Sequence, residues 1–340
     1  MSLKTGRLFG GVEGGGTCSK LVVVDDDGNV LLSRTFGGLN YHIVGLENAV
    51  DRVATVILEA LAETCGVRKL TGLGLGLSGA KDGSTQNEEF VRIFKNKYPD
   101  VSENVYLTSD TLGTLKAILP NGGAVVISGT GSSSLLMLNE HVYRCGGNGH
   151  LVGDRGSGIW IALRAIRYVL DDASGWEMPP HDCTLVRNLL HSYFEIEDDL
   201  EILNHLYKSF SKPKVSGFCK ELSKYGSDKL VAAIFNEAGV LLGRHIDIIA
   251  KKAIQQGINI DCLEIVAVGS VFESWNLLKK GFIKGVSGDN GSPAISEMRV
   301  YAVKGTVAKG LAYMASKEAN FPFQYDFEAS RTLLCAHKFT

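Results

Sequence analysis

One local pattern occurs twice in this chain, and it restricts the possible fold more than any other feature of the sequence. An apolar strand runs into a turn of glycine and hydroxyl residues, and a second apolar strand leaves that turn. The first copy is Phe9–Thr17 with residues 18–24, and the second is residues 123–132 with residues 134–138. Because repeated sequence patterns commonly mark repeated structural units, we predict two related α/β halves, each opened by such a hairpin.

The composition of these turns indicates an anion as their ligand. Glycine adopts positive φ angles without steric cost and lets backbone N–H groups approach an anion closely. The first hairpin alone fits an ordinary tight turn better than a phosphate site, because short glycine motifs often occur by chance. The second copy favours phosphate, since two facing tips would hold one polyphosphate from opposite sides.

The rest of the chain alternates between predicted helices and strands. In the first half, strands at 70–77 and 105–108 alternate with helices at 45–64, 85–98 and 111–119. In the second half, strands at 263–268 and 299–303 lie among helices at 157–171, within 181–225, and at 228–256, 273–285 and 305–316. We therefore predict an N-terminal lobe at 1–118 and a larger lobe at 119–340, with a helical insertion near 157–257. The tail 317–340 has no assignable pattern.

Composition excludes several classes of protein. The chain has 340 residues, which favours two domains, and its 45% hydrophobic and 21% charged residues are typical of a soluble globular protein. A net charge of −2 predicts no nucleic-acid or membrane partner, and no apolar run is long enough to be a membrane helix. The seven scattered cysteines lack a C-x-x-C pair, which predicts a reducing, cytoplasmic location.

Familiar catalytic motifs are missing from the sequence. It contains no Walker-type phosphate loop, no dinucleotide fingerprint and no H-E-x-x-H zinc motif. Gly76–Ala80 differs from a hydrolase nucleophile elbow at its last position. His150 has no second ligand at metal spacing, so we predict no protein metal site.

Two regions carry candidate functional acids. Asp110 follows an apolar strand and precedes a helix, where it could be a catalytic base or simply the helix N-cap. Cys145–Gly158 contains six glycines, and its Asp154 could bind ligand hydroxyls or cap the next helix, as could Ser157. Gly217, predicted to open a helix, and Gly269-Ser270 could support a nucleotide or form plain turns.

Taken together, these stretches resemble the N-acetylglucosamine kinases of the BadF/BadG-type ATPase family, within the sugar kinase/heat-shock/actin superfamily. The resemblance rests on four segments: Val12–Thr17, Ile127–Ser132, Gly146–Ser157 and Val268–Trp275. It implies a two-lobed, actin-like (ribonuclease H-like) ATPase fold, with duplicated β-meander/α domains that flank a cleft.

The resemblance also implies roles for individual residues. Asp110 would be the general base for ATP- and Mg²⁺-dependent phosphorylation of the 6-hydroxyl of N-acetylglucosamine, in a cytoplasmic homodimer. The residues implied to contact ATP are Gly15, Gly16, Thr17, Gly129, Thr130, Gly217, Ser270 and Ser274. The residues implied to contact the sugar are Asn40, Ser78, Ser132, Gly147, Asn148 and Asp154.

Two positions depart from the family pattern. Asn148 stands where the family usually has Trp, which removes an apolar wall beside the sugar, and Arg155 stands in place of Glu. These departures bear on the substrate more than on the reaction. Two alternatives stay open: a kinase for another hexose or hexosamine, such as glucosamine or glucose, and a catalytically weak sugar-binding protein.

Overall fold

The computed structural model describes residues 6–16, 18–63, 69–288 and 291–339. The chain forms two compact units. The first contains Met1–Gly122 and Val303–Thr332, and the second contains Gly123–Ala302 and Leu333–Thr340. No helix in the described ranges is long and apolar enough to span a membrane.

The first unit is built on a five-stranded sheet with the order β3-β2-β1-β4-β5. Strands β1 (Phe9–Gly14), β2 (Cys18–Val24) and β3 (Val30–Gly37) form an antiparallel meander. Strands β4 (Leu70–Leu77) and β5 (Ser102–Ser109) continue the sheet parallel to β1. Helices connect these strands: α1 (Tyr41–Val44), α2 (Leu46–Glu63), α3 (Thr85–Lys97) and α4 (Asp110–Ile118).

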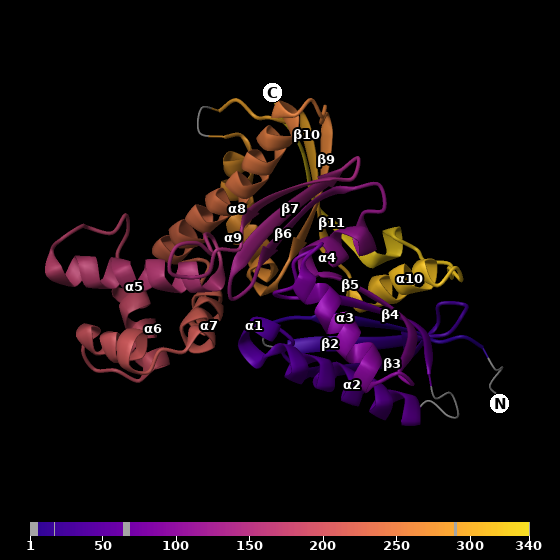
Figure 1. Ribbon diagram of the computed structural model, residues 1–340. Helices are drawn as coiled ribbons and strands as arrows, with labels where there is room; N and C mark the ends of the chain where they lie inside the picture. The colour runs from indigo at the N-terminus through magenta and orange to yellow at the C-terminus, as the bar shows by residue number, and fades with distance from the viewer. Residues whose placement is uncertain (1–5, 17, 64–68, 289–290, 340) are drawn as a thin grey trace. The chain divides into compact units, whose positions relative to one another are not determined.

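The two faces of this sheet pack against different helices because alternate residues of a strand point to opposite sides. Val12 belongs to the core shared with α2 and α3. Phe9 faces α10 (Ala308–Glu318), which covers the other side (Figure 1). Glycines permit this close approach, since a Cβ at Gly11 would lie 1.8 Å from the carbonyl oxygen of Ala308.

The second unit repeats this topology with one strand more. Its sheet has the order β11-β10-β9-β6-β7-β8. Strands β6 (Gly123–Ser128), β7 (Ser132–Leu138) and β8 (His141–Gly146) form the meander. Strands β9 (Cys262–Val268) and β10 (Glu297–Val303) run parallel to β6, and β11 (Arg331–Lys338) forms the edge.

Two long helices of the second unit, α8 (Lys229–Gln255) and α9 (Trp275–Val286), pack together in unusually close contact. A Cβ at Gly243 would lie 2.1 Å from the carbonyl oxygen of Phe282, and one at Gly285 would lie 2.1 Å from that of Val240. Before α8 come α5 (Gly158–Ser174), α6 (Thr184–Phe194), short helical turns at Asp199–Glu201 and Asn204–Lys208, and α7 (Lys212–Ser223). A 3₁₀ turn at Ser270–Ser274 leads into α9. Helix α8 packs against β6, β7 and β8, and the glycine-rich segment follows β8.

The structure confirms the duplicated hairpin and differs from the sequence prediction at three places. Val303–Thr332, predicted in the second lobe, belongs to the first unit because α10 packs on β1 and β4. Strands β8 and β11 were not predicted. Helix α7 begins at Lys212, so Gly217 lies inside it and does not open it.

Candidate functional site

In the first unit, three strands end side by side at one edge of the sheet. Gly14 of β1 is in register with Leu77 of β4, and Leu77 is in register with Ser109 of β5. The next residues along the chain are Gly15, Ser78 and Asp110. The fold therefore places the first hairpin tip, a predicted sugar residue and the predicted base at the same edge, where α/β sheets commonly bind ligands.

Asp110 is not the N-cap of α4. Ser109 has that role, because its Oγ accepts a hydrogen bond from the backbone N of Leu112 at 3.2 Å. The Asp110 carboxylate instead accepts from the backbone N of Thr111 at 2.7 Å. With the cap supplied by a neighbour, the N-cap interpretation of Asp110 is wrong, and half-buried Asp110 lies in the first turn of the helix.

A second carboxylate, missed by the sequence reasoning, fixes the end of β5. Asp82 accepts hydrogen bonds from Thr108 Oγ1 at 2.7 Å, from the backbone N of Ser109 at 2.8 Å and from Ser109 Oγ at 2.7 Å. These contacts hold the residue just before Asp110. The only local signal is the sequence Asp82-Gly83-Ser84, which indicates a turn and gives no hint of this contact.

Two residues of the first unit that are predicted to bind the sugar are in contact with each other. Asn40 Nδ2 donates to Ser78 Oγ at 3.4 Å, and Asn40 Oδ1 accepts from the backbone N of His42 at 3.0 Å. Asn40 thereby caps the short helix α1, which fixes the direction of its side chain. The structure brings together a hydroxyl and an amide, the kinds of group that bind sugar hydroxyls.

The first hairpin tip leaves open space at one of its glycines. Gly15 closes the turn, since its N donates to the carbonyl of Cys18 at 3.1 Å. At Gly16, an added Cβ would meet no described atom within 4 Å. Neither packing against a described residue nor a positive φ explains Gly16, and the absence of a side chain leaves its backbone accessible. Thr17, the predicted hydroxyl contact, lies outside the described residues.

The second tip has the same property and additional anchors. An added Cβ at Gly129 also meets no described atom within 4 Å. The Gly129 carbonyl accepts from the N of Gly158 at 2.8 Å, and its N donates to the carbonyl of Gly131 at 3.0 Å. Thr130 lies between these anchored glycines. The tip is thus joined to the beginning of α5 at the end of the glycine-rich loop.

The residues predicted to contact adenosine are Gly269-Ser270, Ser274 and Gly217, and of these only Gly269 is shown to touch the backbone beside this tip. Gly269 follows β9, and a Cβ there would lie 2.3 Å from the carbonyl oxygen of Ser128, so the two backbones touch. Ser270 and Ser274 form the 3₁₀ turn that comes next. Gly217 is set back in α7, where a Cβ would lie 2.4 Å from Tyr193 Oη. Helix packing is therefore a sufficient reason for that glycine.

The glycine-rich loop places Asp154 at its centre. Asp154 has a φ of 49° and is only 4% exposed. Its Oδ1 accepts from the backbone N of Ser132 at 3.1 Å, and its Oδ2 accepts from Lys212 Nζ at 2.8 Å. Ser157 caps α5, which rules out Asp154 as the cap. A buried aspartate with a left-handed backbone conformation and a fixed carboxylate is costly in free energy. Such arrangements are typical of binding sites.

Ser132 and Gly147 join the same cluster. Ser132 Oγ donates to the carbonyl of Arg155 at 2.8 Å, and the N of Gly147 donates to the carbonyl of Ser132 at 3.0 Å. Ser132 is thus hydrogen-bonded to both Asp154 and Gly147, and all three are predicted to bind the sugar. The sequence reasoning missed Lys212. The pattern Ser211-Lys212-Pro213 is a helix-start signal, and it would have placed the start of α7 at this lysine.

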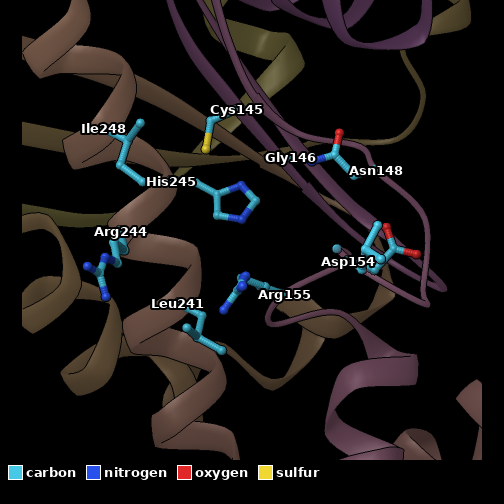
Figure 2. A pocket seen from close by; sticks show the side chains of 11 residues that line it. Cys145, Gly146, Asn148, Asp154, Arg155, Leu241, Arg244, His245 and Ile248 are labelled. Atoms are coloured by element: carbon cyan, nitrogen blue, oxygen red, sulfur yellow. The ribbon is translucent and has the colours of Figure 1, made fainter.

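A cavity of about 420 Å³ opens beside this loop. Figure 2 shows Asn148 and Asp154 on one side and residues of α8 on the other, with the His245 ring in the middle. His245 is 5% exposed, and its Nδ1 is enclosed without a hydrogen-bond partner in the described part of the chain. Burial, together with the charge of Arg155, lowers the pKa of His245 to about 4. Its ring is therefore neutral at physiological pH.

Comparison with known proteins finds a matching family and relatives that are sugar kinases. The sequence profile described as the BadF/BadG/BcrA/BcrD ATPase family matches residues 11–308. A glucosamine kinase of Vibrio cholerae is 31% identical over 189 residues, which are 54% of this chain and 61% of that protein. An N-acetyl-D-glucosamine kinase of Dictyostelium discoideum is 30% identical over 175 residues, 48% of this chain and 54% of the relative. The chain therefore spans less than two thirds of the length of these relatives.

A solved structure extends the similarity to the whole fold. It is a Chromobacterium violaceum protein described as a candidate N-acetylglucosamine kinase. It matches with a TM-score of 0.67 and 20% identity, covering 91% of this chain and 99% of its own. The predicted actin-like ATPase fold is thereby confirmed.

Proposed function

This chain belongs to the BadF/BadG/BcrA/BcrD ATPase family, and on that premise we propose that it is an ATP-dependent kinase that phosphorylates the 6-hydroxyl of N-acetylglucosamine. The observation that carries the proposal is the edge of the first sheet. There Asp110, which does not cap α4, directly follows β5, and the neighbouring strand β4 ends at Leu77, just before Ser78. The hairpin tip with its open glycine ends at the same edge.

In the proposed reaction, the oxygen of the sugar hydroxyl attacks the γ-phosphorus of ATP, and Asp110 accepts the proton of that hydroxyl. The bond between that phosphorus and the bridging oxygen breaks, and ADP leaves. Phosphoryl transfer needs little covalent help from the protein, so positioning and charge stabilisation supply most of the rate. The open space at Gly16 and Gly129 lets the phosphates approach the backbone of both tips closely.

The sugar is assigned to the hydroxyl, amide and carboxylate groups described above. Asp154 can accept from sugar hydroxyls while Lys212 and Ser132 hold its direction. Asn40 and Ser78 supply a further pair of polar groups on the first unit. Adenosine is assigned to Ser270 and the residues around it, with Ser274 and Gly217 as further predicted contacts.

Magnesium is proposed as the companion of ATP. The described residues contain no group of three or more His, Cys, Asp or Glu side chains that could hold a metal ion. Mg²⁺ in kinases is bound mainly by phosphates and water with one or two carboxylates, which fits a site of this kind. Bound there, it would neutralise charge on the phosphates.

A coupled ADP-release assay over a panel of sugars tests the proposal. The panel contains N-acetylglucosamine, glucosamine and glucose, and we expect the highest kcat/KM for N-acetylglucosamine. Asp110→Asn should lower kcat by about 10²–10⁴-fold, because removing a general base has that typical effect. Preference for glucosamine or glucose would select the other-hexose alternative. Sugar binding without ADP release in the native protein would select the sugar-binding alternative.

We also propose a homodimer. Trp176 and Met178, in the connection between α5 and α6, are 83% and 87% exposed, and exposed large apolar side chains are often covered by a partner. Light scattering should give twice the mass of the chain. Trp176→Asp should shift it to the monomer, and a monomeric native protein would refute the dimer.

A further inference from the structure

A second cavity of the second unit lies between the end of the glycine-rich loop, α5 and α8. Its volume of about 550 Å³ is within the range of small-molecule pockets. None of the residues predicted to contact ATP or the sugar lines it. The proposed kinase reaction therefore gives this cavity no role.

The charged side chains around this cavity carry an excess of positive charge. Arg155, Arg164 and Arg167 line it, and Glu237 is the one acid among the described lining residues. Arg164 Nε donates to Glu237 Oε2 at 2.8 Å, and Glu177, outside the lining, also acts electrostatically on Arg164. Arg155 and Arg167 are exposed and form no ion pair with any residue that the structure describes. Their mutual repulsion would be relieved by an anion.

The guanidinium of Arg164 is held in a fixed direction. It donates to Tyr168 Oη at 2.7 Å and lies 4.1 Å from the centroid of that ring. Tyr168 is 4% exposed, and its hydroxyl donates to Glu237 Oε1 at 2.7 Å. Arg167 is three residues further along α5, so both arginines lie on one face of the helix. A guanidinium that is already ordered loses less conformational freedom when it binds a ligand.

The third arginine, Arg155, is one of the departures from the family pattern. With the usual Glu at this position, the charged side chains of the lining would be two arginines and two acids, and the cavity would be neutral. The positive excess is therefore a property of this chain. Arg155 also lines the first cavity, and its carbonyl accepts from Ser132 Oγ at 2.8 Å.

We propose that this second cavity binds a small phosphomonoester, with Arg155 and Arg167 as counter-ions of its phosphate and Trp160 against its organic part. Two guanidinium groups without a protein counter-ion match a charge of about −1.5 to −2, which a phosphomonoester carries at neutral pH. A carboxylate would leave one of them uncompensated. Arginine also binds phosphate with two parallel hydrogen bonds. Trp160 is half-buried in the lining and offers a flat apolar wall.

Isothermal titration calorimetry of the full chain tests this site, with a non-hydrolysable ATP analogue and N-acetylglucosamine present at saturation. The probes are phenyl phosphate, inorganic phosphate and benzoate. We expect phenyl phosphate to bind at least about tenfold more tightly than benzoate, which has the same ring and a single charge. Arg167→Gln should weaken phenyl phosphate by about 10- to 100-fold. Arg92→Gln, the same change at an exposed arginine of α3, should leave its Kd unchanged.

A further variant tests the wall assigned to the organic part. Trp160→Leu should weaken phenyl phosphate by about 3- to 10-fold and leave inorganic phosphate unaffected. Equal affinity of the native protein for phenyl phosphate and inorganic phosphate would refute the phosphomonoester and indicate free phosphate.

Three results would overturn the site itself. They are no binding of phenyl phosphate at millimolar concentration, equal binding of benzoate, and equal Kd values in Arg167→Gln and Arg92→Gln. Phenyl phosphate that binds only when the ATP analogue is omitted would also contradict it, because the probe would then occupy the proposed nucleotide site. Since no ADP release is measured, these results do not depend on the kinase proposal.

Discussion

The hairpins that open the two units are copies of one motif, yet they are built into the protein in different ways. The first tip has residues 15–18 between its last paired residues, and the second has residues 129–131. The first hairpin is tied to the last helix of the chain. Glu13 accepts from Thr306 Oγ1 at 2.7 Å and from the N of Val307 at 3.2 Å, just before α10 begins. The second hairpin is tied to the glycine-rich loop.

Several hydrogen bonds connect that loop to the second hairpin. They join Ser128 to Gly156, Gly129 to Gly158, and Ser132 to Gly147, Asp154 and Arg155. The first hairpin therefore serves the reacting edge that carries Asp110, whereas the second is connected to the residues proposed to choose the sugar. The same backbone motif can thus be kept for phosphate while its anchors take different functions.

Gly11→Ala should destabilise the first unit most. Its Cβ would lie 1.8 Å from the backbone oxygen of Ala308, so α10 must move. Overpacking of this kind costs about 3 kcal/mol or more, and the melting temperature should fall by roughly 10 °C. The control is Gly10→Ala, whose Cβ meets only the flexible ends of Leu70 and Leu73. Equal melting temperatures of the two variants would refute the close seat of α10.

Gly129→Ala should weaken the binding of ATP and leave the stability of the protein unchanged. A Cβ there meets open space among the described residues, and it would occupy the position proposed for phosphate. A methyl group that displaces the phosphate from the tip should cost about one charge-assisted hydrogen bond, which predicts a rise of about 10- to 100-fold in the KM for ATP. The same change at Gly16 should behave alike if both tips bind phosphate. A lower melting temperature with an unchanged KM would contradict this role.

Lys212→Met should affect the second hairpin through Asp154. It leaves a carboxylate that is 4% exposed without its cation. Because Lys212 is partly exposed, we expect a loss of about 1–2 kcal/mol, below the usual cost of breaking a fully buried pair. The KM for the sugar should rise and that for ATP should change little. Lys220→Met, on an exposed position of the same helix, is the control. An unchanged sugar KM would separate Lys212 from the site.

The smallest effect concerns mild acid. The unfolded chain takes up a proton at His245 below about pH 6.5, whereas the folded protein does so only below about pH 4. The free energy of unfolding should therefore fall as pH decreases from 6.5 to 4, by about 1–2 kcal/mol between pH 7 and pH 5. His245→Gln should remove this part of the acid sensitivity. All three tryptophans lie in the second unit, so their fluorescence reports its unfolding, and identical pH dependence in both proteins would refute the prediction.

The local elements and both hairpin tips could be predicted from the sequence, because strand alternation and glycine-hydroxyl turns are short-range patterns. The caps could be predicted only in part: Ser157 was one of two candidates for α5, whereas for α4 the acid Asp110 was the candidate and its neighbour Ser109 is the cap. The Lys212–Asp154 pair joins positions far apart in the chain, and only the packing of α7 brings them together.

The domain division failed for the same reason at a larger scale. Nothing within 305–316 indicates which sheet this helix covers. The answer lies in Gly11 and Gly74, where a Cβ would strike the backbone of α10. Glycines in buried strands are a signal for a closely packed helix.

Because α10 packs on the first sheet, that sheet is covered only late in synthesis of the chain. Residues 6–122 leave the ribosome first, but the helix that covers their sheet begins at Ala308, after nearly the whole second unit. At about 5–20 residues per second, the nascent first sheet exposes one apolar face for roughly ten seconds or longer. The part made first is completed last. A translational pause before residue 308 would prolong its dependence on chaperones more than a pause of equal length after residue 318.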